Sequence, residues 1–276
     1  MDRIRLIASD MDATLLDEQS QLPADFEETI HALAELGIRF APASGRPLYT
    51  LEAMFPTLQD ELVFIGDNGG AIRWKGQNLF TSEMSPEGWR ALNRLTREQG
   101  DIAVLCGLES AYVERPFAVH DAVLRHFYTK IEYVDRLEDV TAPADKFTIY
   151  LPQHNAQQAY DTVYASQRSI YSVAVAGECW VDIMNPGVHK GAALQTLGQL
   201  WGLPSESMMA FGDTYNDAEM LQTVRYGFLM DNGSKPLRQK VPFLAPSHRE
   251  AGVMQVLHRV LAQNGCVCPE DFIPAH

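Results

Sequence analysis

The stretch SDMDATLLD, residues 9–17, directly follows the apolar run IRLIA, and the interpretation of the whole chain starts from it. It places two carboxylates, Asp10 and Asp12, two residues apart where a buried strand is expected to end. Side chains two apart in a strand leave it on the same side, so both acids are expected to face one site. Asp is also common at solvated strand ends and helix caps, so the meaning of the pair depends on the residues that join it.

The chain outside its middle third alternates strands with helices, as judged from apolar spacing and from Gly and Pro stop signals. Strands are expected at residues 4–9, 38–44, 62–66, 208–212 and 226–230. Helices are expected at residues 23–37, 47–55, 189–202, 216–224 and 250–263. This alternation predicts a parallel sheet with right-handed crossovers.

The middle of the chain has a different character, with helices and short strands that read as an α+β module. Its last part, residues 170–184, is expected to be a hairpin whose two-residue turn is Gly177 and Glu178. The fold class is therefore α/β, with a core made of residues 1–84 and 186–276. Residues 85–185 would form a cap inserted into that core and set substrate specificity.

Polar clusters stand at the ends of the expected core strands or at the starts of the helices. They consist of Asp10 with Asp12, Ser44 with Gly45 and Arg46, Lys190, and Asp213 with Asn216 and Asp217. In an open parallel sheet, ligands bind beyond the carboxyl ends of the strands. The clusters are therefore expected to converge on one pocket.

Three of these acids, Asp10, Asp213 and Asp217, would be difficult to keep together without a cation. Two carboxylates about 4 Å apart repel by about 4 kcal/mol at an effective dielectric near 20. A set of oxygen ligands with an open position suits Mg²⁺, which retains waters and accepts phosphate oxygens. The sequence therefore predicts a magnesium site.

The remaining polar residues suit phosphoryl chemistry. A carboxylate such as Asp10 can attack phosphorus, and Lys190 would offset the charge of the phosphate. Ser44 and the backbone N–H groups near it, at a helix start primed by Pro47, suit phosphate oxygens. Asp12 could protonate the leaving oxygen and later deprotonate the attacking water, as a general acid and base.

Several stretches resemble, in order and spacing, the motifs of the haloacid dehalogenase superfamily: DMDATLLD, ASGRP, HKGAAL and GDTYNDAEML. DNGGAI and MDNGSKPLRQKVPFLAPSHREAGV resemble its Cof-type subgroup (subclass IIB) of sugar-phosphatase-like hydrolases. The resemblance implies a Rossmann-like core with an α+β cap. It also implies a Mg²⁺-dependent phosphatase that acts through an aspartyl-phosphate.

The resemblance also assigns roles to residues. Asp10 would be nucleophile and metal ligand, and Asp12 the acid/base, with its backbone carbonyl on the metal. Asp213 would bind the metal directly, and Asp217 directly or through water. The phosphate would be held by Thr14, Ser44, Gly45, Arg46, Lys190 and Asn216.

Ala13 and Thr214 depart from the family pattern, which usually has Gly at the first position and often at the second. A positive φ is costly for any residue but Gly. We therefore expect Ala13 to have a negative φ, so that Gly there would be a preference and not a requirement.

Other functions use similar residues. A phosphotransferase or phosphomutase needs the same acids and differs mainly in excluding water. A receiver-like phospho-acceptor domain is disfavoured, because Asp10 follows the first strand and the inserted cap requires a substrate to close over. A binding protein that has lost activity is disfavoured by the intact acids.

Composition limits the partners. The formal net charge of −14 disfavours nucleic acid and anionic membranes, and no apolar run approaches the ~18 residues of a membrane span. The four cysteines form no disulfide framework, and Cys266 and Cys268 lack further metal ligands nearby. We expect a cytoplasmic monomer or homodimer that acts on a small phosphorylated metabolite. Polar candidates for substrate contact in the cap are Tyr112, Arg115, His120, His126 and Lys146.

Overall fold

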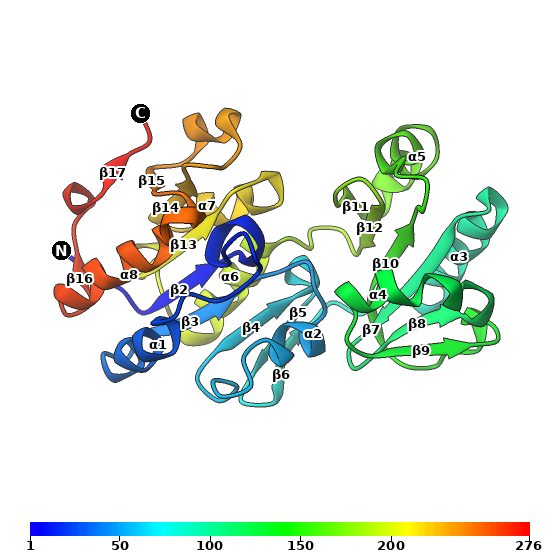
Figure 1. Ribbon diagram of the computed structural model, residues 1–276, viewed down its shortest axis with the longest axis horizontal. Coiled ribbons are helices and arrows are strands. Elements are labelled where there is room, and N and C mark those ends of the chain that lie inside the picture. Colours follow the sequence, from blue (N-terminus) through cyan, green and yellow to red (C-terminus); the bar gives the residue numbers. More distant parts are fainter. The chain divides into compact units, whose positions relative to one another are not determined.

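The computed structural model describes residues 1–276 and divides into two compact units (Figure 1). The first unit comprises Met1–Gly45, Phe55–Leu79 and His189–His276. The second comprises Arg46–Met54 and Phe80–Val188. Residues 46–54, which the sequence pattern places in the core, thus group with the second unit.

The first unit is built on a six-stranded sheet of order β17-β15-β14-β13-β2-β3. Its strands are β2 (Leu6–Ser9), β3 (Arg39–Pro42), β13 (Met208–Gly212), β14 (Tyr226–Met230), β15 (Phe243–Ala245) and β17 (Ile273–Pro274). All pairings are parallel except that of β17 with β15. The central strands β2, β13 and β14 are almost wholly apolar and buried along their whole length, as expected for a parallel sheet covered on both faces. The predicted α/β class is confirmed.

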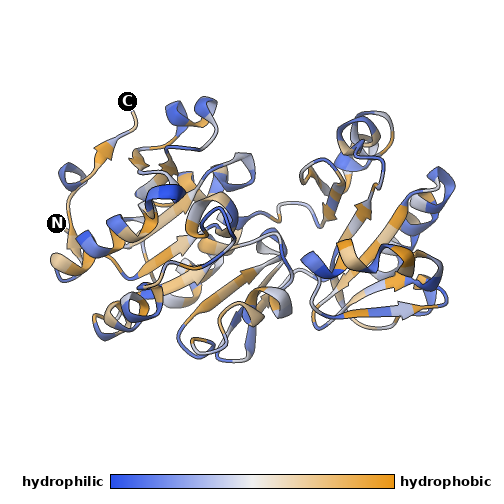
Figure 2. Cartoon of the chain, in the orientation of Figure 1, coloured by the Kyte–Doolittle hydropathy of each residue, from blue (hydrophilic) through white to orange (hydrophobic).

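Helices carry the connections between these strands. They are α1 (Phe26–Glu35), α6 (Lys190–Trp201), α7 (Ala218–Thr223) and α8 (Gly252–Ala262). In α1, Phe26, Ile30 and Leu33 recur on one face and are buried. Figure 2 shows the result, with orange strands inside and blue residues on the outer parts of the helices.

The strand predicted at residues 62–66 pairs with the main sheet only near its carboxyl end. Strand β4 (Val63–Gly66) makes a single parallel bridge, from Ile65 to Ala43, just beyond β3. Its main partner is β5 (Ala71–Trp74), which runs antiparallel to it and is followed by β6 (Gln77–Thr81). This small sheet places residues 67–70, the turn between β4 and β5, beside the end of β3, where the Asn68 N–H donates to the Ser44 carbonyl. A short pair, β1 (Asp2–Arg3) with β16 (Cys266–Val267), joins the two ends of the chain.

The second unit has its own six-stranded sheet, of order β11-β12-β10-β7-β8-β9. The strands are β7 (Ile102–Gly107), β8 (Ala111–Glu114), β9 (Ile131–Val134), β10 (Ala144–Tyr150), β11 (Ser172–Val175) and β12 (Trp180–Met184). The helices are α2 (Leu48–Ala53), α3 (Pro86–Gln99), α4 (Asp121–Phe127) and α5 (Ala156–Thr162). Apolar clusters built around Phe147 and around Val104 form separate cores, as alternation along the strands requires.

Two details of the second unit differ from the sequence expectation. The hairpin of β11 and β12 forms, but its loop has three residues, 177–179, because the Ala176 N–H still donates to the Trp180 carbonyl at 2.9 Å. Strand β9 was not expected, since its residues are only partly buried and carry no clean alternation.

No helix of the chain is both long and apolar enough to cross a membrane.

Candidate active site

Asp10 lies one residue beyond β2, at the carboxyl edge of the main sheet. The parallel pairing of β2 with β3 extends to this edge, since the Ala43 N–H, just beyond β3, donates to the Ser9 carbonyl at 2.8 Å. Asp10 is 8% exposed, whereas Asp12 is exposed. The strand ends at Ser9, so the expectation that strand alternation aligns the two acids is wrong. Asp12 instead belongs to a wide turn, residues 11–15, that follows the strand.

Lys190 is the first residue of α6 and is fully buried. Its Nζ donates to Asp10 Oδ1 through a short contact and to Asp217 Oδ1 at 2.7 Å. The helix begins here because the His189 Nδ1 caps it, accepting from the Ala192 N–H at 3.1 Å. Gly191 is required by packing, since a Cβ there would lie 2.7 Å from the Glu219 carbonyl of α7.

Asp217 precedes α7 and uses both of its carboxylate oxygens. While Oδ1 accepts from Lys190, Oδ2 accepts from the backbone N–H groups of Asp213 at 3.0 Å and Thr214 at 3.2 Å. Gly212 permits this, because a Cβ at that position would lie 2.4 Å from the Asp217 Cβ. Asp217 therefore fixes both the lysine and the loop that carries Asp213.

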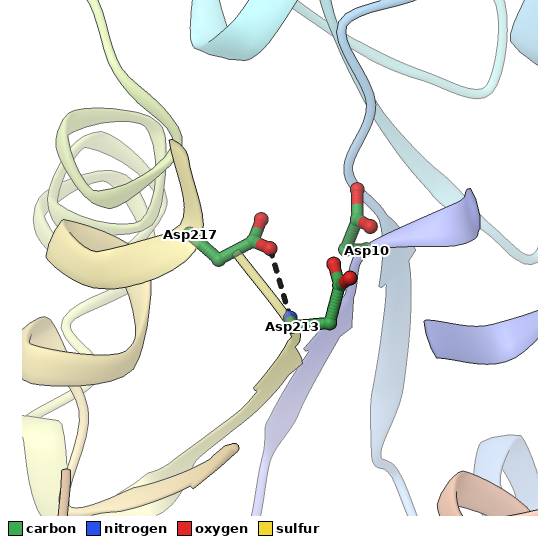
Figure 3. Close-up of side chains that lie close together, drawn as sticks. All are labelled: Asp10, Asp213 and Asp217. Carbon is green, nitrogen blue, oxygen red and sulfur yellow. Dashed lines mark hydrogen bonds between the residues drawn. The ribbon is translucent and has the colours of Figure 1, made fainter. Parts of the chain in front are cut away.

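Figure 3 shows the carboxylates of Asp10, Asp213 and Asp217 turned toward a common space, from the ends of β2 and β13 and the start of α7. One oxygen of each lies within 4.8 Å of the others. Burial, together with the charge of Asp217, raises the pKa of Asp10 to about 8 although Lys190 lowers it. Burial and Asp217 likewise raise the pKa of Asp213 to about 7. The site therefore disfavours the full set of negative charges.

Lys190 balances only part of this charge. Burial by itself would lower its pKa, but the carboxylates of Asp10 and Asp217 outweigh burial and raise the pKa above its ordinary value. One buried ammonium thus faces three carboxyl groups, too few positive charges for all three to ionise together, so a cation that binds here would replace the protons of Asp10 and Asp213. The donors are all oxygen, which suits a hard divalent ion.

The expected phosphate-binding residues take different positions. Ser44 is buried at the end of β3, where its N–H donates to the Ile65 carbonyl and its carbonyl accepts from the Asn68 N–H, both at 2.9 Å. Gly45 follows it, and a Cβ there would lie 3.2 Å from the Asn68 amide. Asn216 is exposed in the turn before α7.

Thr14 and Arg46, the other two expected phosphate-binding residues in this part of the chain, lie in different units of the protein. Thr14 is 1% exposed, and its Oγ1 is buried with no hydrogen-bond partner in the protein. A buried hydroxyl without a partner is costly, so it is suited to a ligand. Arg46 belongs to the second unit, so its phosphate-binding role rests on the motif alone.

The expectation for Ala13 is wrong. Its φ is 58° and its ψ 12°, in the left-handed region, between Asp12 at φ −72° and the buried Thr14. The turn of residues 11–15 therefore needs the conformation that Gly adopts most readily, and alanine adopts it at a cost. The family preference for Gly at this position has a physical reason in this chain.

Asn232 was not singled out from the sequence as a site residue. Its side-chain Nδ2 donates to the Ala13 carbonyl at 2.9 Å across a separation of 219 residues. The stretch MDNG around it carries the Cof-type resemblance, but nothing local indicates its partner. Only the fold brings it to the turn, because β14 pairs with β13, and β13 in turn pairs with β2.

Comparison with known proteins identifies relatives along nearly the whole chain. The family described as haloacid dehalogenase-like hydrolase matches residues 7–257. The chain is 31% identical over 262 residues to 5-amino-6-(5-phospho-D-ribitylamino)uracil phosphatase YbjI of Escherichia coli K12, covering 94% of this chain and 96% of that protein. It is also 31% identical over 249 residues to the HMP-PP phosphatase of Cronobacter sakazakii, covering 87% and 89%.

A solved structure shares the arrangement. SMU.1108c of Streptococcus mutans UA159 superposes with a TM-score of 0.83 at 29% identity, covering 94% of this chain and 99% of that one. The chain therefore spans nearly the full length of the proteins it resembles, second unit included.

Proposed function

The chain belongs to the haloacid dehalogenase-like hydrolase family and is a phosphoric monoester hydrolase by class; from that premise we propose that it is a Mg²⁺-dependent phosphatase of small phosphomonoesters that works through an aspartyl-phosphate. In this proposal Asp10 is the nucleophile, Asp12 the general acid and base, and residues 85–185 the insertion that selects the substrate.

The observation that carries the proposal is the buried bridge of Lys190 to Asp10 and Asp217. A purely structural ion pair would need only one acid for the one lysine. Here three acids lie around Lys190, and burying the two additional carboxylates would destabilise the fold. Such an excess of buried carboxylates is typical of an active site, where binding of a cation or substrate changes the local charge during function. The same bridge holds one Asp10 oxygen, so the other is left for substrate.

Mg²⁺ fits this cluster, and Asp10 and Asp213 would hold it together with the Asp12 backbone carbonyl. Bound there, it would supply charge neutralisation for the phosphoryl oxygens. Asp217 is better suited to act through water or through Lys190, because both of its oxygens already accept hydrogen bonds. The acids, with their raised pKa values, would release protons when the ion binds.

The chemistry then divides into two displacements. An Asp10 oxygen bonds to phosphorus as the ester P–O bond breaks, and Asp12 gives its proton to the leaving oxygen. A water molecule next bonds to phosphorus while Asp12 takes its proton, and the bond from phosphorus to Asp10 breaks. Lys190 stays protonated throughout and attracts the phosphate, whose charge the acidic protein would otherwise repel.

The substrate is proposed to be a small metabolite with one terminal phosphate, such as a sugar phosphate, a nucleotide or a phosphorylated cofactor. The Thr14 hydroxyl, buried without a partner in the protein, supplies a donor for a phosphate oxygen. Ser44 is proposed as a second phosphate-binding residue on the strength of the motif that contains it. The substrates named for the two relatives, 5-amino-6-(5-phospho-D-ribitylamino)uracil and HMP-PP, are the first compounds to test.

The test is phosphate release from p-nitrophenyl phosphate and from a panel of phosphorylated metabolites, with Mg²⁺ and with excess EDTA. We expect release that needs Mg²⁺, is lost in Asp10→Asn, and falls by at least ~100-fold in Asp12→Asn on substrates with poor leaving groups. The exposed Asp60, changed to Asn, is the matched control in the same unit and should have no effect.

Two results would overturn the proposal. Undiminished hydrolysis by Asp10→Asn would remove the nucleophile from the mechanism. Phosphate that moves between positions of the substrate, with little release to water, would instead mark a phosphomutase.

A further inference from the structure

The turn that carries the proposed acid/base depends on a left-handed alanine. Ala13 stands at φ 58°, directly after Asp12 and before the buried Thr14. For alanine this region is less favourable than the extended or helical regions, so local conformational preference alone does not explain the left-handed backbone of Ala13. A contact from elsewhere in the chain is needed to favour it.

The side chain of Asn232 supplies such a contact. Its Nδ2 donates to the Ala13 carbonyl at 2.9 Å, and its Oδ1 accepts from the His248 N–H at 3.0 Å. Both ends of the amide are thus used, which fixes its orientation. The hydrogen bond is made at the carbonyl of the left-handed residue itself, so it is sensitive to the conformation of the Ala13 peptide.

The backbone around Asn232 contacts the second acidic loop as well. The Ser234 N–H donates to the Asp213 carbonyl at 2.7 Å. A Cβ on Gly233 would lie 2.7 Å from the same carbonyl, so the approach is close. The short turn of residues 231–234 therefore touches the loop of Asp10 and Asp12 on one side and the loop of Asp213 on the other.

We propose that Asn232 is a positioning residue that holds Ala13 in the left-handed conformation and so sets the turn that carries Asp10 and Asp12 relative to the Asp213 loop. This inference rests on the proposed phosphatase function for its kinetic consequence, but not for its structural one. Asn232 is proposed to touch no reacting atom and to act on the site through the Ala13 peptide, while its bond to the His248 N–H orients the amide. Because its side chain is exposed, truncation leaves no cavity and separates positioning from folding.

The kinetic test uses Asn232→Ala with p-nitrophenyl phosphate and Mg²⁺. Without the contact the turn spends less time in the left-handed form, so kcat should fall roughly tenfold while KM changes less than about twofold. Adding Ala13→Gly should recover most of the lost kcat, because Gly adopts that form readily. The control is Asp231→Asn in the same turn, where only the exposed contact to Arg238 changes and wild-type kcat is expected.

A second measurement needs no activity at all. In the metal-free protein, Ala13→Gly should raise the melting temperature by roughly 2–4 °C in the wild-type background, where the left-handed cost is present. In the Asn232→Ala background, where Ala13 can relax, the gain should be clearly smaller.

The outcomes separate the two proposals. A wild-type protein without phosphatase activity contradicts the proposed function, and the melting temperatures still decide the role of Asn232. An equal gain from Ala13→Gly in both backgrounds overturns the positioning role, as does a kcat of Asn232→Ala equal to that of the wild type in an active enzyme. A loss of kcat that Ala13→Gly fails to recover contradicts it too.

Discussion

At the scale of single residues, the site combines side chains that are satisfied by the protein with side chains that are not. Lys190 donates to Asp10 and Asp217, and Asp217 also accepts from the backbone N–H groups of residues 213 and 214. The Thr14 Oγ1 is buried and lacks a partner. Within the site, such an atom is suited to a ligand that completes its hydrogen bonding. Thr14 is therefore the residue at which binding and stability should be most clearly opposed.

Thr14→Val tests this opposition, because valine keeps the shape and removes the hydroxyl. We expect KM for p-nitrophenyl phosphate to rise about tenfold, since a hydrogen bond to phosphate is lost. The free energy of unfolding should stay equal or rise by up to ~1 kcal/mol, because an unsatisfied buried group is removed. Steady-state kinetics and thermal unfolding of the same variant decide it, and a lower KM or a clear loss of stability would count against the assignment.

At the scale of elements, the site depends on how closely α6 and α7 approach each other. Lys190 reaches Asp217 because Gly191, the next residue, lies against the Glu219 backbone. The same helix has a second glycine, Gly198, whose added Cβ would meet mainly the flexible end of Met208. The two positions offer a matched comparison within one helix.

Gly191→Ala should push the start of α6 away from α7, lowering stability by about 1–3 kcal/mol and activity by at least tenfold. Gly198→Ala should retain activity, since Met208 can move and alanine favours the helix. Circular dichroism melts with parallel assays measure both. Equal effects of the two substitutions would mean that the contact between α6 and α7 does not position Lys190.

Sequence patterns could predict the parts of the site that depend on strand ends. Asp10 beyond β2 and Asp213 beyond β13 follow from apolar runs that stop at polar residues, and neighbouring parallel strands then bring them together. The left-handed Ala13 and the contact from Asn232 could not be found this way, because they depend on the pairing of distant segments. The short joint of β4 to the main sheet and the longer loop of the β11–β12 hairpin are set by register, which local composition does not encode.

At the scale of the whole molecule, the charge of the site should appear in the stability of the protein. Asp10 and Asp213 have pKa values near 8 and 7 when folded, against an ordinary value of 3.8. Between about pH 4 and pH 8 the folded state therefore holds protons that the unfolded state has lost. Raising the pH through this window favours unfolding, and the associated stability is fully present only below about pH 4.

Metal-free protein should consequently lose several degrees in melting temperature between about pH 6 and pH 8.5, and Asp10→Asn should flatten that decline. Mg²⁺ should stabilise the protein more at the higher pH, because it competes with protons for the same oxygens. Scanning fluorimetry in EDTA and in Mg²⁺ gives the comparison. A melting temperature that rises with pH in EDTA would show that the acids are not protonated in the folded state.

The central claim is that Asp10 accepts the phosphoryl group, and trapping the phosphoenzyme tests it most directly. Asp12→Asn lacks the base for the second step, whereas p-nitrophenolate leaves without needing a proton, so the variant should accumulate the intermediate. Acid quenching within one turnover, followed by peptide mass spectrometry, should place one phosphoryl group on Asp10. Release of p-nitrophenolate with no phosphoryl group on Asp10, or with the group on another residue, would contradict the account.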